Sequence, residues 1–409
     1  MSQTRNSFRV AIRRFDPFSA AIEKQWAAFQ AAEGIDLQLE AELLDLHPLY
    51  ESYFEQDGLK RGEWDVGFLV SDWFATAHEQ QAVLDIGPLL DSNPPDGYPD
   101  GWTPSMLRMQ QFGETVLGLP YHDGPECLIY RKDLFEDPQE QAAYQARYGV
   151  PLAPPESWEE FHQIARFFHR PHQGLYGTVF AAYPDGHNTV YDFCLQLWTR
   201  GGELFDASGN LHLNTPQAIA ALNYYRSVLN DPAAIHPQAR RLDSVESGLA
   251  FAAGEVAMMI NWFGFAGMAE TIASSKVKGR VDVTTIPHAK GSAPASLNVY
   301  WILCVAAGSP HAEVAYRFLR HCASAPMDKL LTLEGGIGCR KSTWSDAAVN
   351  AAIPFYHKME ALHRYARELP RLPEWAQIAA LIDELVLAAI NTNQSTADLV
   401  QIAQGKIAA

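Results

Sequence analysis

Cysteine is scarce in this sequence, and its spacing is irregular. The five cysteines include no C-x-x-C pair, so neither a disulfide framework nor a zinc ribbon is indicated. We expect most of them to be small buried apolar side chains. His162, His169 and His172 lie near one another in the sequence, but no carboxylate motif accompanies them, and we expect neither a metal nor a cofactor.

Positive charge and long apolar runs are also scarce. The formal net charge is −17 at pH 7, and no Lys/Arg cluster stands out against that background, which excludes nucleic acid as an expected partner. No segment reaches the roughly 18 uninterrupted apolar residues that are needed to span a bilayer. Residues 1–8 lack the apolar core of a secretory signal, so we expect an extracytoplasmic protein if a signal was trimmed and a cytoplasmic one if Met1 is the native start.

The local signatures of common enzymes are missing. There is no G-x-S-x-G, no H-E-x-x-H, no phosphate loop and no G-x-G-x-x-G opening a helix. Glu159 and Glu160 are adjacent on a predicted helix and therefore point apart, and Asp96 and Asp100 lie in a Pro/Gly loop. Because glycosidases carry few local signatures, a carbohydrate-active enzyme remains an alternative to the expectation that this chain is not an enzyme.

The amino-terminal part of the sequence predicts an α/β unit. Residues 8–12 predict a strand, the apolar spacing through Phe29 predicts a helix, and residues 36–44 alternate like a second strand, which together make a βαβ unit. Residues 64–70 form a nearly continuous apolar run, typical of a strand buried on both faces, which ends at Asp72 and Trp73. Open α/β sheets bind ligands at the carboxyl ends of strands, so we expect Asp16, Asp72 and Trp73 to border one crevice.

The rest of the chain also predicts a mixture of strands and helices. Ser157 predicts a helix cap, and residues 205–211 predict a tight turn rather than a calcium loop, because the glycine falls too early for an EF-hand. The composition, with 47% hydrophobic residues over 409 positions, allows two or three folding units. Further strands are predicted within 116–130, at 281–286 and at 301–306, and further helices at 191–197, 218–229, 309–321, 373–390 and from 396 onward.

One stretch carries a resemblance to a known family. Residues 117–124, LGLPYHDG, followed by residues 128–135, LIYRKDLF, resemble family 1 extracellular solute-binding proteins of ABC importers, which bind carbohydrates and include proteins like the maltose-binding protein. The likeness continues in sequence order at residues 157–161, 201–202, 214–216, 251–259, 309–319 and 335–342. It therefore extends over almost the whole chain.

The resemblance implies a two-lobed α/β periplasmic-binding-protein fold of type II, with hinge-linked lobes and a ligand cleft between them. It places residues 1–118 and 267–325 in an amino-terminal lobe, and residues 119–266 and 326–409 in a carboxyl-terminal lobe. Crossing segments are expected near residues 117–123, 261–266 and 325–335. The implied function is capture of a sugar or sugar derivative by lobe closure, as the substrate-binding component of an ABC transporter. We expect a monomer that meets the permease subunits; a cytosolic sensor or scaffold on the same fold is the alternative.

A sugar site needs aromatic faces for C–H surfaces and polar groups for hydroxyls. Trp262 resembles the family position at which an aromatic residue meets ligand. Tyr300 and Trp301 should point to opposite sides of their strand, so that one contacts ligand and the other packs. The full set of candidate ligand-binding residues is Asp16, Asp72, Trp73, Tyr121, His122, Asp123, Tyr183, Asn261, Trp262, Asn298, Tyr300, Trp301 and Arg340.

Each candidate also has a purely structural interpretation. Trp262 would then pack in a hinge, Asp72 would cap a helix, and Asp123 would form a turn with Gly124. Arg340 would form a structural salt bridge; facing ligand instead, it would favour an anionic one. The aromatic content favours a sugar over an amino acid, and a polyol, a sulfonated sugar or a sugar phosphate remains open.

Overall fold

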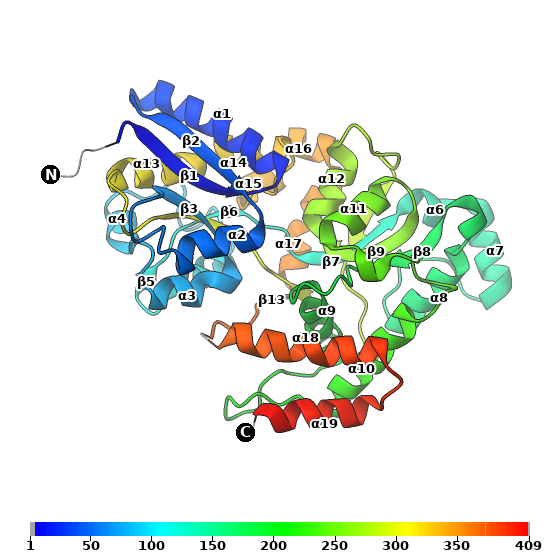
Figure 1. Cartoon of the computed structure of the whole chain (residues 1–409). Coiled ribbons are helices and arrows are strands. Elements are labelled where there is room, and N and C mark those ends of the chain that lie inside the picture. Colours follow the sequence, from blue (N-terminus) through cyan, green and yellow to red (C-terminus); the bar gives the residue numbers. More distant parts are fainter. Residues whose placement is uncertain (1–4, 373, 408–409) are drawn as a thin grey trace. The chain divides into compact units, whose positions relative to one another are not determined.

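The computed structural model describes residues 5–372 and 374–407 and divides them into two compact units (Figure 1). Unit 1 takes its residues from 1–124, 299–352 and 369–373, and unit 2 from 125–298, 353–368 and 374–409. Residues 1–4, 373, 408 and 409 of the predicted lobes lie outside the described residues. Both units combine sheet and helix, which confirms the predicted α/β class.

The unit boundaries differ from the predicted ones in four stretches, of which two are short: residues 119–124 and 369–373 belong to unit 1. Residues 267–298 belong to unit 2, because β10 (Val281–Thr284) pairs antiparallel with β7 (Glu126–Arg131). Residues 326–352 belong to unit 1, because α14 (Ala325–Leu333) packs on α1 (Asp16–Glu33). Hydrophobic patterns along the chain mark where elements begin, but they do not say which distant strand or helix an element will join.

The main sheet of unit 1 has the strand order β2-β1-β3-β12-β6. β1 pairs parallel with both β2 and β3, which confirms the predicted βαβ unit, and β12 lies antiparallel between β3 and β6. Every residue of β3 is buried, as the continuous apolar run predicted. The strands of this unit are β1 (Ser7–Arg13), β2 (Gln38–Leu44), β3 (Val66–Val70), β4 (Gln111–Phe112), β5 (Thr115–Val116), β6 (Leu119–His122) and β12 (Trp301–Val305).

Helix α1 covers this sheet and has clear end signals. It begins with Asp16 and Pro17 in its first turn and ends at Gly34, whose φ of 65° favours glycine. Its buried Trp26 stacks on Phe8 of β1, with ring centroids 4.5 Å apart. The other helices of unit 1 are α2 (Leu46–Tyr50), α3 (Phe74–Glu79), α4 (Gly87–Ser92), α5 (Pro104–Met109), α13 (Ala312–Cys322), α14, α15 (Lys341–Trp344) and α16 (Ala347–Ala352), with shorter helical turns η1 (Glu51–Glu55) and η2 (Ser71–Trp73).

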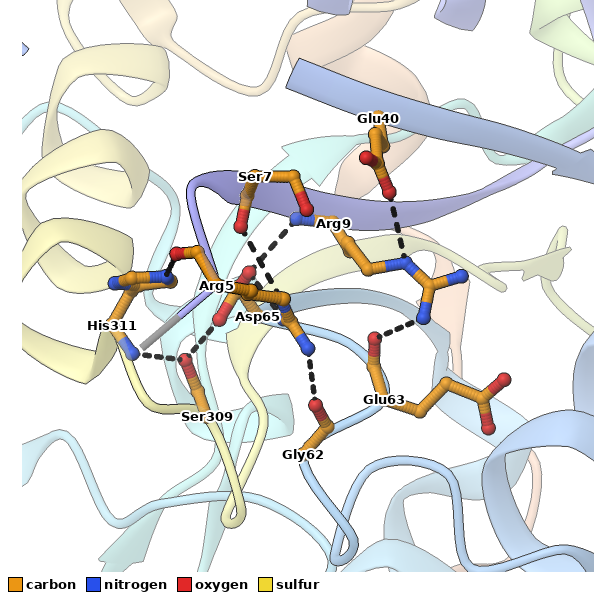
Figure 2. A network of polar contacts seen from close by, with 9 residues as sticks. All are labelled: Arg5, Ser7, Arg9, Glu40, Gly62, Glu63, Asp65, Ser309 and His311. Atoms are coloured by element: carbon orange, nitrogen blue, oxygen red, sulfur yellow. Dashed lines mark hydrogen bonds and ion pairs between the residues drawn. The ribbon is translucent and has the colours of Figure 1, made fainter. Parts of the chain in front are cut away.

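A buried carboxylate, Asp65, ties three separate segments of unit 1 together (Figure 2). Its Oδ2 accepts hydrogen bonds from Nη2 of Arg5 at 2.5 Å and from the backbone N–H of Arg9 at 2.8 Å. Its Oδ1 accepts from the hydroxyl of Ser309 at 2.6 Å, and His311 lies 3.0 Å from the carbonyl of Arg5 through Nε2. A buried charge is tolerated when it is paired and hydrogen-bonded in this way, so the network holds the start of β1 against the segment before α13.

The main sheet of unit 2 has the strand order β10-β7-β9-β8. β9 pairs antiparallel with β7 and parallel with β8. Gly177 in β8 lies so close to α8 that an added Cβ would be 1.8 Å from the carbonyl of Ala165, which only glycine avoids. The strands of this unit are β7, β8 (Tyr176–Val179), β9 (Val256–Trp262), β10, β11 (Ser296–Leu297) and β13 (Ala366–Arg367).

The helices of unit 2 follow the sequence signals closely. Ser157 forms a capping box with Glu160 at the start of α8, and Asp206 accepts backbone N–H bonds from Ser208 and Asn210, which confirms the predicted cap and tight turn. α9, α10, α18 and α19 pack together. The helices are α6 (Lys132–Glu136), α7 (Pro138–Tyr148), α8 (Trp158–Phe168), α9 (Asn188–Trp198), α10 (Pro216–Leu229), α11 (Ser244–Ala252), α12 (Phe263–Thr271), α17 (Met359–His363), α18 (Trp375–Asn391) and α19 (Thr396–Ile407), with shorter turns η3 (Pro171–Gln173), η4 (Ala239–Arg241) and η5 (Tyr356–Lys358).

All five cysteines are free and buried, as expected. Among the described residues, no group of three or more His, Cys, Asp or Glu side chains is placed to hold a metal ion. In the same part of the chain, no helix combines the length and the apolar character that crossing a membrane requires.

Candidate functional site

In unit 1, four chain segments bring candidate residues to one edge of the sheet. The parallel strands β1 and β3 end there, so the turns that carry Asp16 and Asp72 lie at that edge. β12 begins at the same edge, where Trp301 pairs with Val70, and β6 ends there, where His122 pairs with Trp301. The strand topology therefore brings together residues that are almost 300 positions apart in the sequence.

The side chains at this edge form a cluster of rings flanked by carboxylates. The ring of Trp301 meets that of Trp73 edge-on at 6.1 Å and that of Phe18 at 6.2 Å between centroids. Trp73 is buried whereas Trp301 keeps partial exposure; Asp16 is exposed, and Asp72 is half-buried. The edge thus combines a partly accessible indole with two acidic groups.

His122 adds a neutral imidazole to this edge. Its Nδ1 accepts the backbone N–H of Ile337 at 2.9 Å, and its ring lies 4.7 Å from that of Phe18. Burial lowers the pKa of His122 to about 4, although the neighbouring carboxylate of Asp123 acts in the opposite direction. With Nδ1 acting as an acceptor, the proton of the neutral ring is on Nε2.

Other candidates of unit 1 are held inside the unit. The buried Tyr121 donates its hydroxyl to Oε1 of Gln25 at 2.9 Å, and the fully buried Tyr300 donates to the carbonyl of Met106 at 2.8 Å. Of the Tyr300–Trp301 pair, Tyr300 is thus fully buried, whereas Trp301 keeps partial exposure. Asp123 is fully buried, and its backbone N–H donates to the carbonyl of Ile337. Ligand contact by Tyr121, Asp123 and Tyr300 stays a prediction.

Arg340 is buried among main-chain carbonyls. Its Nη1 donates to the carbonyl of Ala323 and its Nη2 to that of Asp96, both at 2.9 Å, and the guanidinium lies 4.4 Å from the ring centroid of Trp102. Burial lowers the pKa of Arg340, and attraction from Asp328 opposes this. The guanidinium thus has a structural role in linking loops of unit 1, and its contact with an anionic ligand stays a prediction.

In unit 2, β7 and β9 bring Glu126 and Trp262 to the same edge of the second sheet. The two residues are directly opposite in the antiparallel ladder, so their side chains lie on the same face. The ring of Trp262, which is partly exposed, meets the ring of Tyr191 edge-on at 5.7 Å between centroids. An indole and a carboxyl group therefore stand side by side at the end of β9.

Glu126 is a candidate that sequence reasoning missed. It is 5% exposed, and its Oε2 has no hydrogen-bond partner among the described residues. Burial raises the pKa of Glu126 well above its ordinary value, and repulsion from Asp192 raises it further. The signal in the sequence was a single carboxylate at the start of the apolar run 127–130, directly after Gly124 and Pro125.

Asp192, from helix α9, is the second buried acid near this edge. Its Oδ2 accepts the hydroxyl proton of Tyr225 at 2.5 Å. Burial raises the pKa of Asp192 to about 7; the hydrogen bond from Tyr225 favours the charged form, and Asp185 disfavours it. Near neutral pH the protonated and the ionised forms of this carboxyl group are therefore both populated.

The two candidate asparagines of unit 2 differ in their partners. Both atoms of the Asn261 side-chain amide are hydrogen-bonded within unit 2. Its Nδ2 donates to the carbonyl of Ser244 at 2.9 Å, and its Oδ1 accepts from the backbone N–H of Trp262 at 2.8 Å. Asn298 is 1% exposed, yet neither atom of its amide has a hydrogen-bond partner in the described part of the chain. Ser296, two residues earlier, donates its hydroxyl to the carbonyl of Glu126, which places Asn298 on the segment that packs against β7.

Tyr183 lies in the loop between β8 and α9 and is 48% exposed. Asp185 in the same loop accepts the backbone N–H groups of His187 and Asn188 and so starts α9. The loop is thus anchored at its end while Tyr183 remains open to solvent. Ligand contact by Tyr183 stays a prediction.

Chemically, each unit carries a partly exposed tryptophan beside oxygen-bearing side chains at one edge of its sheet. Rings of this kind cover the C–H surface of a ligand, and carboxyl and amide groups bind its hydroxyls. The arrangement suits recognition of a polyhydroxylated molecule.

Comparison with known proteins agrees with the fold. A maltose-bound protein from T. maritima superimposes with a TM-score of 0.85 at 20% identity, covering 98% of this chain and 99% of that one. A solute-binding protein of an ABC transporter from Agrobacterium radiobacter K84, in complex with ribitol, superimposes with a TM-score of 0.84 at 24% identity, covering 98% of both chains. These likenesses confirm the predicted periplasmic-binding-protein fold.

Sequence comparison points the same way. A mannitol-binding protein from Pseudomonas aeruginosa is 24% identical over 331 residues, which are 76% of this chain and 73% of that protein. A probable ABC transporter-binding protein from Deinococcus radiodurans is 26% identical over 264 residues, which are 62% of this chain and only 58% of that relative's length. The family description "Bacterial extracellular solute-binding protein" matches residues 16–329. With more than half of its length matched, the chain belongs to the family of bacterial extracellular solute-binding proteins.

Proposed function

We propose that this chain is the substrate-binding component of an ABC transporter, and that it captures a sugar or a sugar alcohol without transforming it. Family membership supports a binding role. The mannitol-binding relative and the structures bound to ribitol and maltose support the ligand class. The relatives' names also support the permease subunits of an ABC importer as partners, and the family description supports an extracytoplasmic location. A monomeric state is part of the proposal.

The observation that carries this proposal is the buried carboxyl oxygen of Glu126 opposite the ring of Trp262. A buried polar atom without a partner is costly, and a native protein keeps one when a ligand or water completes it. An oxygen beside an indole matches a sugar ring or polyol chain, which presents hydroxyls along its edges and C–H groups on its faces. The unpartnered amide of Asn298 extends the same set of polar groups.

We assign the contacts of unit 1 to the groups that keep some exposure at its sheet edge. These are the ring of Trp301, supported by Trp73, the carboxylates of Asp16 and Asp72, and the Nε2–H of His122. The family resemblance implies that both units take part and that closure of the units captures the ligand; we adopt this as part of the proposal.

A thermal-shift screen tests the ligand class. D-mannitol, ribitol and maltose are compared with amino acids as the control set, because a ligand that binds only the native state raises its stability by about 2.7 kcal/mol at one hundred times Kd. We expect a shift with at least one sugar or sugar alcohol and none with amino acids. The absence of any shift across the carbohydrate set would overturn the proposal.

A second measurement tests the absence of catalysis. The protein is incubated with maltose and longer oligosaccharides, and the products are separated. We expect the oligosaccharides to be recovered unchanged. Product formation that is lost in the Glu126→Gln variant would show that the protein is a carbohydrate-active enzyme instead of a binding protein.

A further inference from the structure

We propose that Glu126 and Asp192, here called the acid pair, make this site selective for uncharged ligands, because Glu126 binds the ligand as a protonated carboxyl group. The inference rests on the proposed function and deepens it by fixing the charge of the ligand and the protonation state in which it is captured. It is independent of which sugar or sugar alcohol binds.

The surroundings of Glu126 disfavour a carboxylate. The side chain is buried, and Oε2 meets no donor among the described residues, so an ionised group there would lie in a medium of low polarity without a counter-charge. Repulsion from Asp192 raises the pKa of Glu126 further, because two neighbouring buried carboxyl groups resist double ionisation. Opposite Glu126 stands Trp262, which offers a ring and no positive charge.

The other elements packed around the acid pair also carry no compensating cation. α10 presents the hydroxyl of Tyr225, which hydrogen-bonds Asp192, and β11 presents Ser296, whose hydroxyl goes to the carbonyl of Glu126. Other charged groups act on the pKa values of these residues from a distance. Asp185 acts on Asp192, and Arg240 acts on Tyr225. Lys358 and Asp282 act on Cys127, which is next to Glu126 in the chain. Lys358 is itself paired with Asp282 at 2.6 Å, and Arg240 with the side chains of Asn391 and Asn230. In the described part of the chain, no Lys or Arg side chain bonds to either acid.

A protonated carboxyl group suits a hydroxyl ligand particularly well. Its O–H donates to a ligand oxygen while its carbonyl oxygen accepts from the next hydroxyl. The amide of Asn298, which has no partner among the described residues, offers the same combination of donor and acceptor. A neutral polyol or sugar therefore satisfies all of these groups. An anionic sugar acid or phosphate would meet two acids, one of them partly ionised near neutral pH, and among the described residues neither acid is bonded to a guanidinium or ammonium group.

Recognition by the protonated form links capture to pH with a definite sign. The ligand binds the state in which Glu126 carries its proton, so affinity is highest at low pH and falls as pH rises through the pKa of Glu126, which burial raises well above its ordinary value. For one linked proton the fall approaches about tenfold per pH unit above that pKa. In the same range, binding takes up a proton from the buffer.

The first test compares matched ligands by titration calorimetry on the full chain. D-mannitol and ribitol are titrated beside D-mannonate and D-ribonate, which differ from them by an oxidised, negatively charged end. We expect the sugar acids to bind at least about tenfold more weakly, since like charges across an interface repel. Equal or tighter binding of the acids would overturn the inference while leaving the proposed function intact, whereas binding of neither class would remove the proposed function itself.

The second test measures proton linkage in wild type and in two amide variants. Wild-type affinity for the neutral ligand is expected to fall as pH rises through the raised pKa of Glu126, with a calorimetric heat that depends on the buffer's ionisation enthalpy. Glu126→Gln replaces the titrating group by an amide that keeps a donor and an acceptor, and we expect it to flatten this pH dependence. Glu159→Gln makes the same change on the exposed side of α8 and should keep the wild-type pH profile.

The contrary outcomes are equally clear. A wild-type affinity that rises with pH would show that the carboxylate binds the ligand. A pH profile that survives in Glu126→Gln would assign the linked proton to another group. Circular dichroism and thermal unfolding of both variants, without ligand, establish that each is folded.

Discussion

The hydroxyl of Tyr225 donates a hydrogen bond to Oδ2 of Asp192 across 2.5 Å in the interior of unit 2. This hydrogen bond opposes burial, because it stabilises the charged carboxylate while burial stabilises the neutral acid. Tyr225 therefore holds the pKa of Asp192 lower than burial alone would set it, and the protonation state of Asp192 depends on α10 as well as on its own helix.

Replacing Tyr225 by phenylalanine removes that hydrogen bond with little change of shape. We expect Tyr225→Phe to raise the pKa of Asp192 above its value of about 7 and to lower the free energy of unfolding by about 1 kcal/mol. Titration of the labelled aspartate carboxyl by carbon NMR measures the first effect, and urea unfolding measures the second. An unchanged or lower pKa would show that the hydroxyl does not control this acid.

His122 is expected to make the stability of unit 1 fall in acid. A carboxyl group with a raised pKa has the opposite effect, because its contribution to stability is lost as pH rises. The pKa of His122 is about 4 in the folded state against 6.5 when unperturbed, so the unfolded chain binds the proton first. Stability is then lost as pH falls from about 6.5 to about 4, by up to about 3 kcal/mol.

The variant His122→Asn tests this. Its Oδ1 takes the place of Nδ1 as acceptor for the N–H of Ile337, but the amide cannot be protonated in this range. Denaturant unfolding of wild type and variant at neutral pH and near pH 4 gives the comparison. We expect the variant to lose less stability on acidification, and a loss equal to that of wild type would assign the acid sensitivity elsewhere.

Trp262 is expected to contribute to ligand binding rather than to the core of unit 2. The residue ends β9 with partial exposure, so Trp262→Ala should leave the protein folded and weaken binding of the sugar or sugar alcohol by about 1–3 kcal/mol. Calorimetry measures the affinity, and Trp262→Phe, which retains a ring, should fall between wild type and alanine. Unchanged affinity or global unfolding of the alanine variant would return Trp262 to a packing role.

The Asp65 network predicts that one surface arginine is unusually important for stability (Figure 2). Arg5→Ala leaves a fully buried carboxylate with fewer donors, and we expect it to cost about 2–3 kcal/mol of unfolding free energy. Ser309→Ala should cost about 1 kcal/mol.

An exposed ion pair provides the control for this comparison. Lys60 lies 3.4 Å from Asp57 with both side chains open to solvent, so Lys60→Ala should cost about 1 kcal/mol or less. Urea unfolding of the three variants gives the ranking. Equal effects of Arg5→Ala and Lys60→Ala would mean that Asp65 does not depend on its arginine.

Local patterns predicted the elements of the fold well. The apolar run at 64–70 became the fully buried β3, because a parallel strand covered on both faces needs apolar side chains in both directions. The cap at Ser157 and the turn at Asp206 also followed from residues that are neighbours in sequence. Such signals are readable because the interactions behind them are local.

Long-range pairing was not readable in the same way. Residues 281–284 look like a strand in isolation, and only their pairing with β7 assigns them to unit 2. Glu126 escaped notice for a related reason, since its importance comes from burial and from facing Trp262 and Asp192, which lie far along the chain. Arg340 shows the converse, because its expected link to an anionic ligand did not anticipate the carbonyls of Ala323 and Asp96 that surround it.

The position of β12 in the sheet of unit 1 has a consequence for how the protein is made. β12 lies between β3 and β6, yet it is synthesised last of the three, at residues 301–305. All four strands of the main sheet of unit 2 lie within residues 126–284, so that sheet can be complete on the ribosome first. Until β12 emerges, β3 and β6 each have an open apolar edge of the kind that recruits foreign strands. Nascent unit 1 is therefore exposed to wrong strand pairing for as long as the intervening chain takes to be translated.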